Sequence, residues 1–182
     1  MIIMNNNLQT TKFSLQELTD RLKTEDSKYA RISKSFQIVY WIFIPVYLFI
    51  SIMELKETGD VNYIITGICY ALSFLIFALV FRNYYLEYKN VNYSLSTLEM
   101  LKRAAQRYKP FRRKTLWIAL ALIFLDIGLC FSSYNQFNIL WLQVLFIGNL
   151  AVGLIIGLII WKIKYKPFRD NVLSMTAEIE NG

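Results

Sequence analysis

Residues 139–161 read ILWLQVLFIGNLAVGLIIGLIIW and contain no charged side chain. Because a helix rises about 1.5 Å per residue, this run reaches about 34 Å, whereas the hydrocarbon core of a bilayer is about 30 Å thick. Three earlier blocks have the same character, over residues 36–53, 63–81 and 116–131. Apolar residues gathered into blocks of this length predict an all-α integral membrane protein with four transmembrane helices.

The composition narrows the class of protein. Of 182 residues, 55% are hydrophobic and 18% are charged, which is too apolar for a disordered chain. The sequence has no histidine, no glycine-rich phosphate loop and no CxxC pair. We therefore expect no enzyme, and no catalytic residue, metal site or cofactor, because intramembrane catalysis needs paired acids, a metal or a nucleophile with its base.

Basic residues alternate between the segments that flank the apolar blocks. In chain order these segments contain six, one, nine, zero and four of the twenty Lys and Arg residues. Short loops rich in Lys and Arg stay in the cytoplasm, so both termini are predicted inside and residues 54–62 and 132–138 outside. This distribution accounts for the net charge of +7, and nucleic acid is not an expected partner. Frequent Asn, Lys, Ile and Tyr are typical of proteins from AT-rich bacterial genomes, so the expected location is a bacterial inner membrane.

The predicted cytoplasmic segments have the pattern of helices. Ser14 with Glu17, and Ser96 with Glu99, each form a capping box that opens a helix. Apolar residues then recur every three or four positions and form a partner helix face, with polar residues opposite: Leu15, Leu18, Leu22, Leu98, Leu101 and Ala105. Such a face suits either a seam with a partner helix or a helix lying at the membrane surface. Pro110 should end or bend the second of these helices.

An internal repeat organises these segments. A shift of 80 positions aligns Ser14, Leu15 and Leu18 with Ser94, Leu95 and Leu98. This indicates two parallel repeats, each a cytoplasmic helix followed by a transmembrane hairpin. The alternative is that any two amphipathic hairpins of similar length align by their polar boundaries. The predicted order is a flexible N-terminus (1–13), an amphipathic helix (14–35), a hairpin with a helical extension (36–90), a basic amphipathic helix (91–114), a second hairpin (115–166) and a cytoplasmic tail (167–182).

One charged residue lies inside an apolar block. Asp126 is near the middle of residues 116–131, where an ionised carboxylate costs about 2.5–3.5 kcal/mol on insertion scales. Counting inward from the cytoplasmic ends places Tyr70 and Asn149 at a similar depth, so the three could form a hydrogen-bonded trio. The functional alternative is a proton, cation or substrate site, and the structural alternative is a bonded carboxyl that fixes helix packing.

Small residues mark two helix faces. Asn149, Gly153 and Gly157 recur every four positions, and the 80-residue shift places Cys69 and Ser73 opposite the first two. Small side chains let helix backbones approach closely in membranes, so both faces are interpreted as packing surfaces inside the bundle, with a homodimer seam as the alternative. Cys69 and Cys130 are interpreted as small packing residues and not as a disulfide.

The remaining candidates are basic side chains next to the apolar blocks. They are expected to contact anionic headgroups of the inner leaflet or a partner: Arg107, Lys109, Arg112, Arg113, Lys114, Lys162, Lys164, Lys166 and Arg169. Together these features favour a small non-enzymatic scaffold or regulatory membrane protein. It would self-associate or dock a cytosolic protein through its inner amphipathic helices. The alternatives are a small ion- or proton-coupled transporter or channel subunit that uses Asp126, and an anti-sigma-like membrane anchor.

Overall fold

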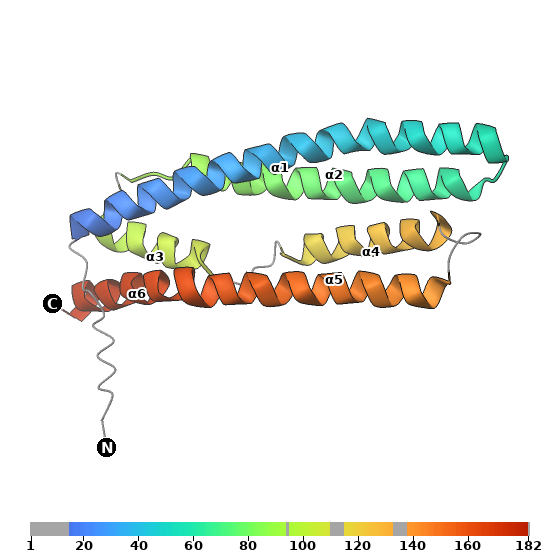
Figure 1. Cartoon of the computed structure of the whole chain (residues 1–182). Coiled ribbons are helices and arrows are strands. Elements are labelled where there is room, and N and C mark those ends of the chain that lie inside the picture. The colour runs from blue at the N-terminus through green and yellow to red at the C-terminus, as the bar shows by residue number, and fades with distance from the viewer. Residues whose placement is uncertain (1–14, 94, 110–114, 133–137, 182) are drawn as a thin grey trace, which may run out of the picture. The chain divides into compact units, whose positions relative to one another are not determined.

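A computed structural model describes residues 15–93, 95–109, 115–132 and 138–181. Within these ranges all regular structure is helical (Figure 1). The elements are α1 (Leu15–Thr58), α2 (Asn62–Lys89), α3 (Thr97–Arg107), α4 (Thr115–Ser132), α5 (Ile139–Ile160), a π-helical turn η1 (Trp161–Tyr165) and α6 (Lys166–Asn181). Four of the described helices are long and apolar enough to cross a membrane, as the sequence predicts. The predicted flexible segment 1–13 lies outside the described residues.

The helix ends follow local sequence signals. The described part of α1 runs from Leu15 to Thr58, and Ser14 of the first capping box lies outside the described residues. Gly59 follows with φ +72°, a left-handed conformation that glycine adopts without a steric penalty, and its N–H donates to the Leu55 carbonyl at 2.8 Å. At α3 the Ser96 hydroxyl accepts from the Glu99 N–H at 3.4 Å. α3 ends at Arg107, and Pro110, which was expected to end or bend this helix, lies outside the described residues.

The chain forms two compact units, and α1 contributes to both. We call residues up to Glu25, 92–109 and 160 onward the polar unit, and residues 26–91 and 110–159 the apolar unit. The polar unit therefore contains the start of α1 with α3, η1 and α6. The apolar unit contains the rest of α1 with α2, α4 and α5.

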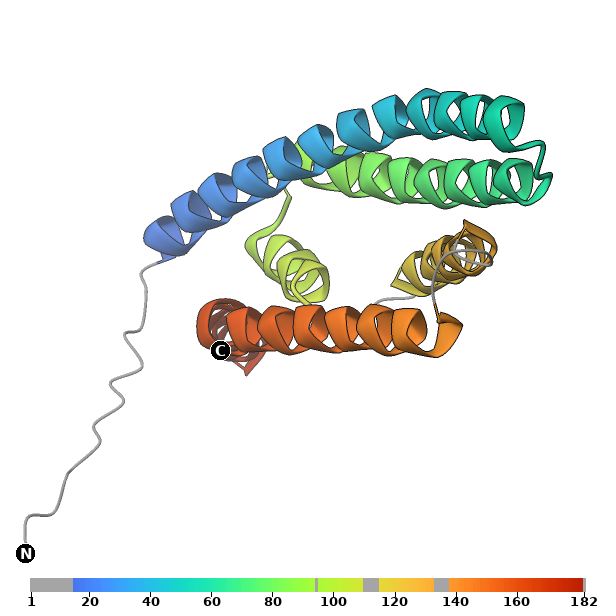
Figure 2. The same cartoon turned by 45° about the vertical axis from the view of Figure 1, so that its right-hand side comes forward.

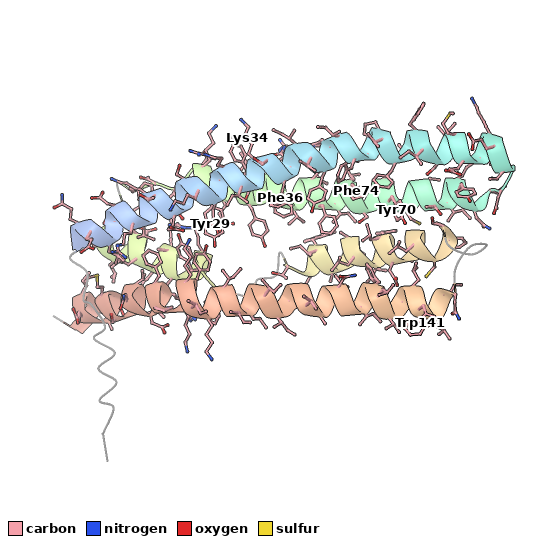
Figure 3. All side chains as sticks on the ribbon, in the orientation of Figure 1. Tyr29, Lys34, Phe36, Tyr70, Phe74 and Trp141 are labelled. Atoms are coloured by element: carbon pink, nitrogen blue, oxygen red, sulfur yellow. The ribbon has the colours of Figure 1, made fainter. Side chains whose placement is uncertain are left out.

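Aromatic rings join α1 to α2 in the apolar unit. Both views show these helices side by side (Figures 1 and 2). The Phe36 and Phe81 ring centroids are 5.1 Å apart, and those of Tyr47 and Tyr70 are 5.2 Å apart, so the two helices run antiparallel. Figure 3 shows Phe36, Phe74 and Tyr70 in order along this contact. Ring pairs at these separations add favourable energy beyond the area that they bury.

Small residues join α2 to α4. The buried Ser73 hydroxyl donates to the Ala121 carbonyl at 2.8 Å, and the Thr66 hydroxyl donates to the Gly128 carbonyl at 3.4 Å. A Cβ added at Gly128 would lie 2.5 Å from the Tyr70 ring, so only glycine fits there without a shift. The two backbones approach closely because Ser73, Ala121 and Gly128 are small, and the hydroxyl bonds fix their register.

Candidate functional site

The intramembrane carboxyl predicted from the sequence is bonded to a glutamine of the next helix. Gln143 Nε2 on α5 donates to Asp126 Oδ1 on α4 at 2.8 Å, and it also lies 3.0 Å from Cys130 Sγ. Asp126 and Cys130 are one helical turn apart, so a single amide group reaches both. An amide nitrogen has two N–H groups, one for each acceptor. This pair links α4 to α5 and partly buries Asp126.

The described contacts differ from the expected trio of Asp126, Tyr70 and Asn149. Asn149 is exposed and donates to the Leu145 carbonyl of its own helix at 2.9 Å. The Tyr70 ring lies against Gly128 and Tyr47. Among the hydrogen bonds of the described residues, the partner of Asp126 is Gln143.

The register of α4 against α5 explains this difference. Asp126 lies six residues before the end of α4 at Ser132, and Gln143 lies four residues after the start of α5 at Ile139. Counting depth from the connection between the two helices therefore pairs Asp126 with Gln143. Counting from the opposite ends, as the sequence prediction did, shifts the pairing along α5. The signal was available in the sequence, because Gln143 and Asn149 are both polar residues in the apolar run, and Gln143 is the one nearer the connection to α4.

One face of α5 is uncovered in the apolar unit. α5 contains no buried residue. A Cβ added at Gly148, Gly153 or Gly157 would meet nothing within 4 Å, in contrast to Gly128. Asn149, Gly153 and Gly157 lie on one side of α5, and we call these three residues the α5 small-residue face. The predicted packing of this face inside the bundle is not seen among the described residues.

Asn149 is the polar member of the α5 small-residue face. In the described part of the chain its amide makes the one hydrogen bond to Leu145. An asparagine amide has two N–H groups and a carbonyl oxygen, so an N–H and the oxygen stay available for a further partner.

The predicted partner helix face is buried within the polar unit. Leu18 and Leu22 of α1 and Leu101 of α3 are 0% exposed, and Ala105 is buried beside them. α3 packs against α6 (Figure 2), where Val172 is fully buried. Leu98 is half-buried, and the side chain of Leu15 is not among those described. These apolar side chains therefore form the core of a small helical unit, and they are not an open surface.

Polar and aromatic contacts join η1 and α6 to the other segments of the polar unit. The Trp161 indole N–H donates to the Tyr108 carbonyl at 3.1 Å, and the Tyr108 ring packs edge-on against Phe168 with centroids 5.3 Å apart. Lys164 Nζ lies 3.1 Å from Glu25 Oε2. Hydrogen bonds to Glu25 and Tyr165 raise the pKa of Lys164 above its ordinary value. Lys102 and Glu180 form an ion pair at 2.5 Å between α3 and α6.

The other predicted site residues are distributed over several elements. Lys109, Lys162, Lys164 and Lys166 are exposed, Arg107 and Arg169 are half-buried, and Arg112, Arg113 and Lys114 lie outside the described residues. Ser73 is buried and Cys69 is half-buried on α2. In the ranges that the structure covers, no three His, Cys, Asp or Glu side chains are grouped as metal ligands.

No protein-family model matches the chain, and neither a curated protein nor a solved structure is significantly similar to it.

Proposed function

We propose that this protein is a small non-enzymatic membrane scaffold or regulatory protein that self-associates through α5. Its four apolar helices would form two transmembrane hairpins in a bacterial inner membrane, with the polar unit in the cytoplasm. The alternating Lys and Arg counts support this orientation. The 80-residue self-match supports an origin in two parallel repeats.

The observation that favours self-association is the uncovered α5 small-residue face. Gly153 and Gly157 provide the GxxxG spacing that lets two helix backbones meet in lipid. A Cβ added at either glycine would meet nothing within 4 Å in the described part of the chain. A helix face without bulky side chains gains little from flexible acyl chains, whereas a second α5 helix can pack its own side chains against it.

Asn149 favours a second copy as the occupant of this face. A polar side chain near mid-depth loses free energy when its N–H and carbonyl groups face hydrocarbon. Asparagine is both donor and acceptor, so two copies related by a two-fold axis can hydrogen-bond reciprocally through the same residue. Hydrogen bonds between membrane helices contribute about 0.6 kcal/mol on average and reach about 1.7 kcal/mol.

Burial of the partner helix face changes where a cytosolic protein would be expected to dock. Because Leu18, Leu22 and Leu101 form the core of the polar unit, a cytosolic partner would meet its exposed, mostly charged surface. The exposed residues include Lys102 and Arg103 on α3 and Lys109 just after it, which suit an acidic surface on the partner.

Cysteine crosslinking in native membranes tests the self-association. Ile160 lies eleven residues after Asn149, close to the same side of α5, so an Ile160→Cys chain without Cys69 and Cys130 should form a disulfide-linked dimer on mild oxidation. Adding Gly153→Ile with Gly157→Ile should reduce the dimer about tenfold or more, because the branched side chains cover the α5 small-residue face. Asn149→Leu should reduce it about two- to tenfold.

Gly148→Ile provides the matched control, since Gly148 lies on the other side of the same helix and is equally open. It should leave the crosslinked fraction unchanged. Equal crosslinking in all variants would contradict self-association through α5.

Asp126 supports a second candidate, a small ion- or proton-coupled transporter or channel subunit. A carboxyl held between α4 and α5 is the kind of group that binds a coupling ion. Its bond to a neutral amide equally suits a structural role, in which Gln143 stabilises the helix pair.

Asp126→Asn separates these two candidates. The variant keeps the shape of the side chain and an oxygen that accepts from Gln143, so under our proposal insertion and the Ile160 crosslink should be retained. Proton and Na⁺ flux in vesicles would be measured alongside. A flux in the parent protein that disappears in this variant alone would favour the transporter.

A further inference from the structure

Two lysines from different helices of the apolar unit converge on one tyrosine ring. Lys34 Nζ of α1 lies 5.9 Å from the centroid of the Tyr85 ring, and Lys89 Nζ of α2 lies 5.4 Å from the same centroid. Both lysines are exposed. The ion pairs of the described residues involve neither of them. Tyr85 itself is half-buried and fixes where the two ammonium groups gather.

This arrangement has an excess of positive charge that an anion would neutralise. Two ammonium groups near one ring repel each other, and the ring's attraction for each cation offsets this only in part. Residues 26–35 and 82–91 together contain five basic and two acidic side chains. A phosphate placed near both lysines would accept hydrogen bonds from each and remove the repulsion.

The surface around the lysines favours an amphipathic anion. Lys34 lies two residues before Phe36, where the sequence of α1 changes from polar to apolar (Figure 3). Phe36 is 45% exposed, and the nearby Ile32 and Leu86 are 52% and 40% exposed. A free phosphate would contact only the lysines. A phospholipid would contact both the lysines, through its headgroup, and the exposed apolar side chains, through its acyl chains.

We propose that Lys34, Lys89 and Tyr85 form a binding site for the phosphate of an anionic phospholipid. The inference rests on the membrane-spanning arrangement proposed above, which places Lys34 of α1 and Lys89 at the end of α2 at the inner leaflet. It goes beyond general attraction to anionic lipid, because it assigns one headgroup to two named lysines that share a ring. The sequence pattern did not select this pair, since 54 positions separate Lys34 from Lys89.

Lipid binding to the detergent-solubilised full chain tests the proposal. The probe is phosphatidylglycerol, with phosphatidylcholine of the same acyl chains as the uncharged reference, and native mass spectrometry counts retained lipids. Lys34→Gln with Lys89→Gln should weaken phosphatidylglycerol binding about tenfold or more and leave phosphatidylcholine binding unchanged. Lys34→Arg with Lys89→Arg should retain the binding, because the charge and the contact with the ring are kept.

Lys162→Gln with Lys166→Gln is the matched control for general headgroup attraction, because both are exposed lysines of the predicted headgroup set that share no ring among the described contacts. It should weaken phosphatidylglycerol binding less than twofold. Equal losses in both glutamine pairs would overturn the site in favour of nonspecific attraction. Displacement of phosphatidylglycerol by millimolar inorganic phosphate would overturn the lipid as occupant in favour of a free anion.

The inference and the proposed function fail separately. If the arginine pair does not retain binding, the lipid site is contradicted, while the Ile160 crosslink still reports on self-association. Extraction of the chain by alkaline carbonate would contradict the membrane arrangement itself.

Discussion

At the scale of single residues, glycine has two different roles in this chain. Gly67 and Gly128 lie where a side chain would collide with Ser51 and with Tyr70, so they allow close helix contact. Gly153 and Gly157 are also glycines, but a Cβ added at either would meet nothing within 4 Å. The sequence alone does not distinguish these roles, because all four are small residues inside apolar blocks.

Gly128→Ala should destabilise the α2–α4 contact by about 1–3 kcal/mol, because the new methyl group must displace the Tyr70 ring. Unfolding in mixed micelles with increasing SDS, followed by tryptophan fluorescence, would measure this change. Gly148→Ala is the control and should change the free energy of unfolding by less than about 0.5 kcal/mol. Equal stability of the two variants would mean that Tyr70 does not pack against Gly128.

At the scale of helices, the sequence predicts the residue ranges of the helices better than it predicts which helices pack against one another. The four apolar blocks and the capping box at Ser96 predicted elements that the structure contains, because hydropathy and capping are local properties. The partner of Asp126 and the covering of Leu22 depend on how helices align with one another. That alignment is set by short connections and by ring contacts such as Phe36 with Phe81, which no local pattern records.

The polar unit gives a prediction at this scale. Leu22→Ala should destabilise the unit by about 2–5 kcal/mol, because Leu22 is fully buried in its core. Protease susceptibility of residues 160–181 in detergent would increase, while α1–α2 packing in the apolar unit would be retained. Lys23→Ala, at the exposed neighbour, is the control. If Leu22→Ala left protection unchanged, Leu22 would be a docking residue, as the sequence pattern suggested.

A triple serine variant of α1 does not distinguish docking from folding of the polar unit. Replacing Leu15, Leu18 and Leu22 with serine would reduce partner binding under either view. The structure predicts that the loss comes from an unfolded polar unit, since Leu18 and Leu22 are 0% exposed. Surface changes such as Arg103→Glu, which leave the core intact, are the variants that report on docking itself.

At the scale of the whole molecule, the account depends on lipid as the solvent of the four apolar helices. Many of their large side chains are exposed, including Phe49 at 64%, Leu140 at 75% and Trp141 at 68%. Apolar surface of this extent is unfavourable in water and ordinary in hydrocarbon. The orientation of these helices is predicted from the sequence, because the Lys and Arg content of each connection indicates the side of the membrane on which it lies.

Labelling of single cysteines in whole cells is the most direct test of that topology. In a chain without Cys69 and Cys130, Glu57→Cys should react with a membrane-impermeant maleimide in intact cells. Ser174→Cys should react only after the inner membrane is opened, because α6 is predicted inside. Labelling of Ser174→Cys in intact cells, with Glu57→Cys protected, would contradict the orientation and with it both proposals for the inner face.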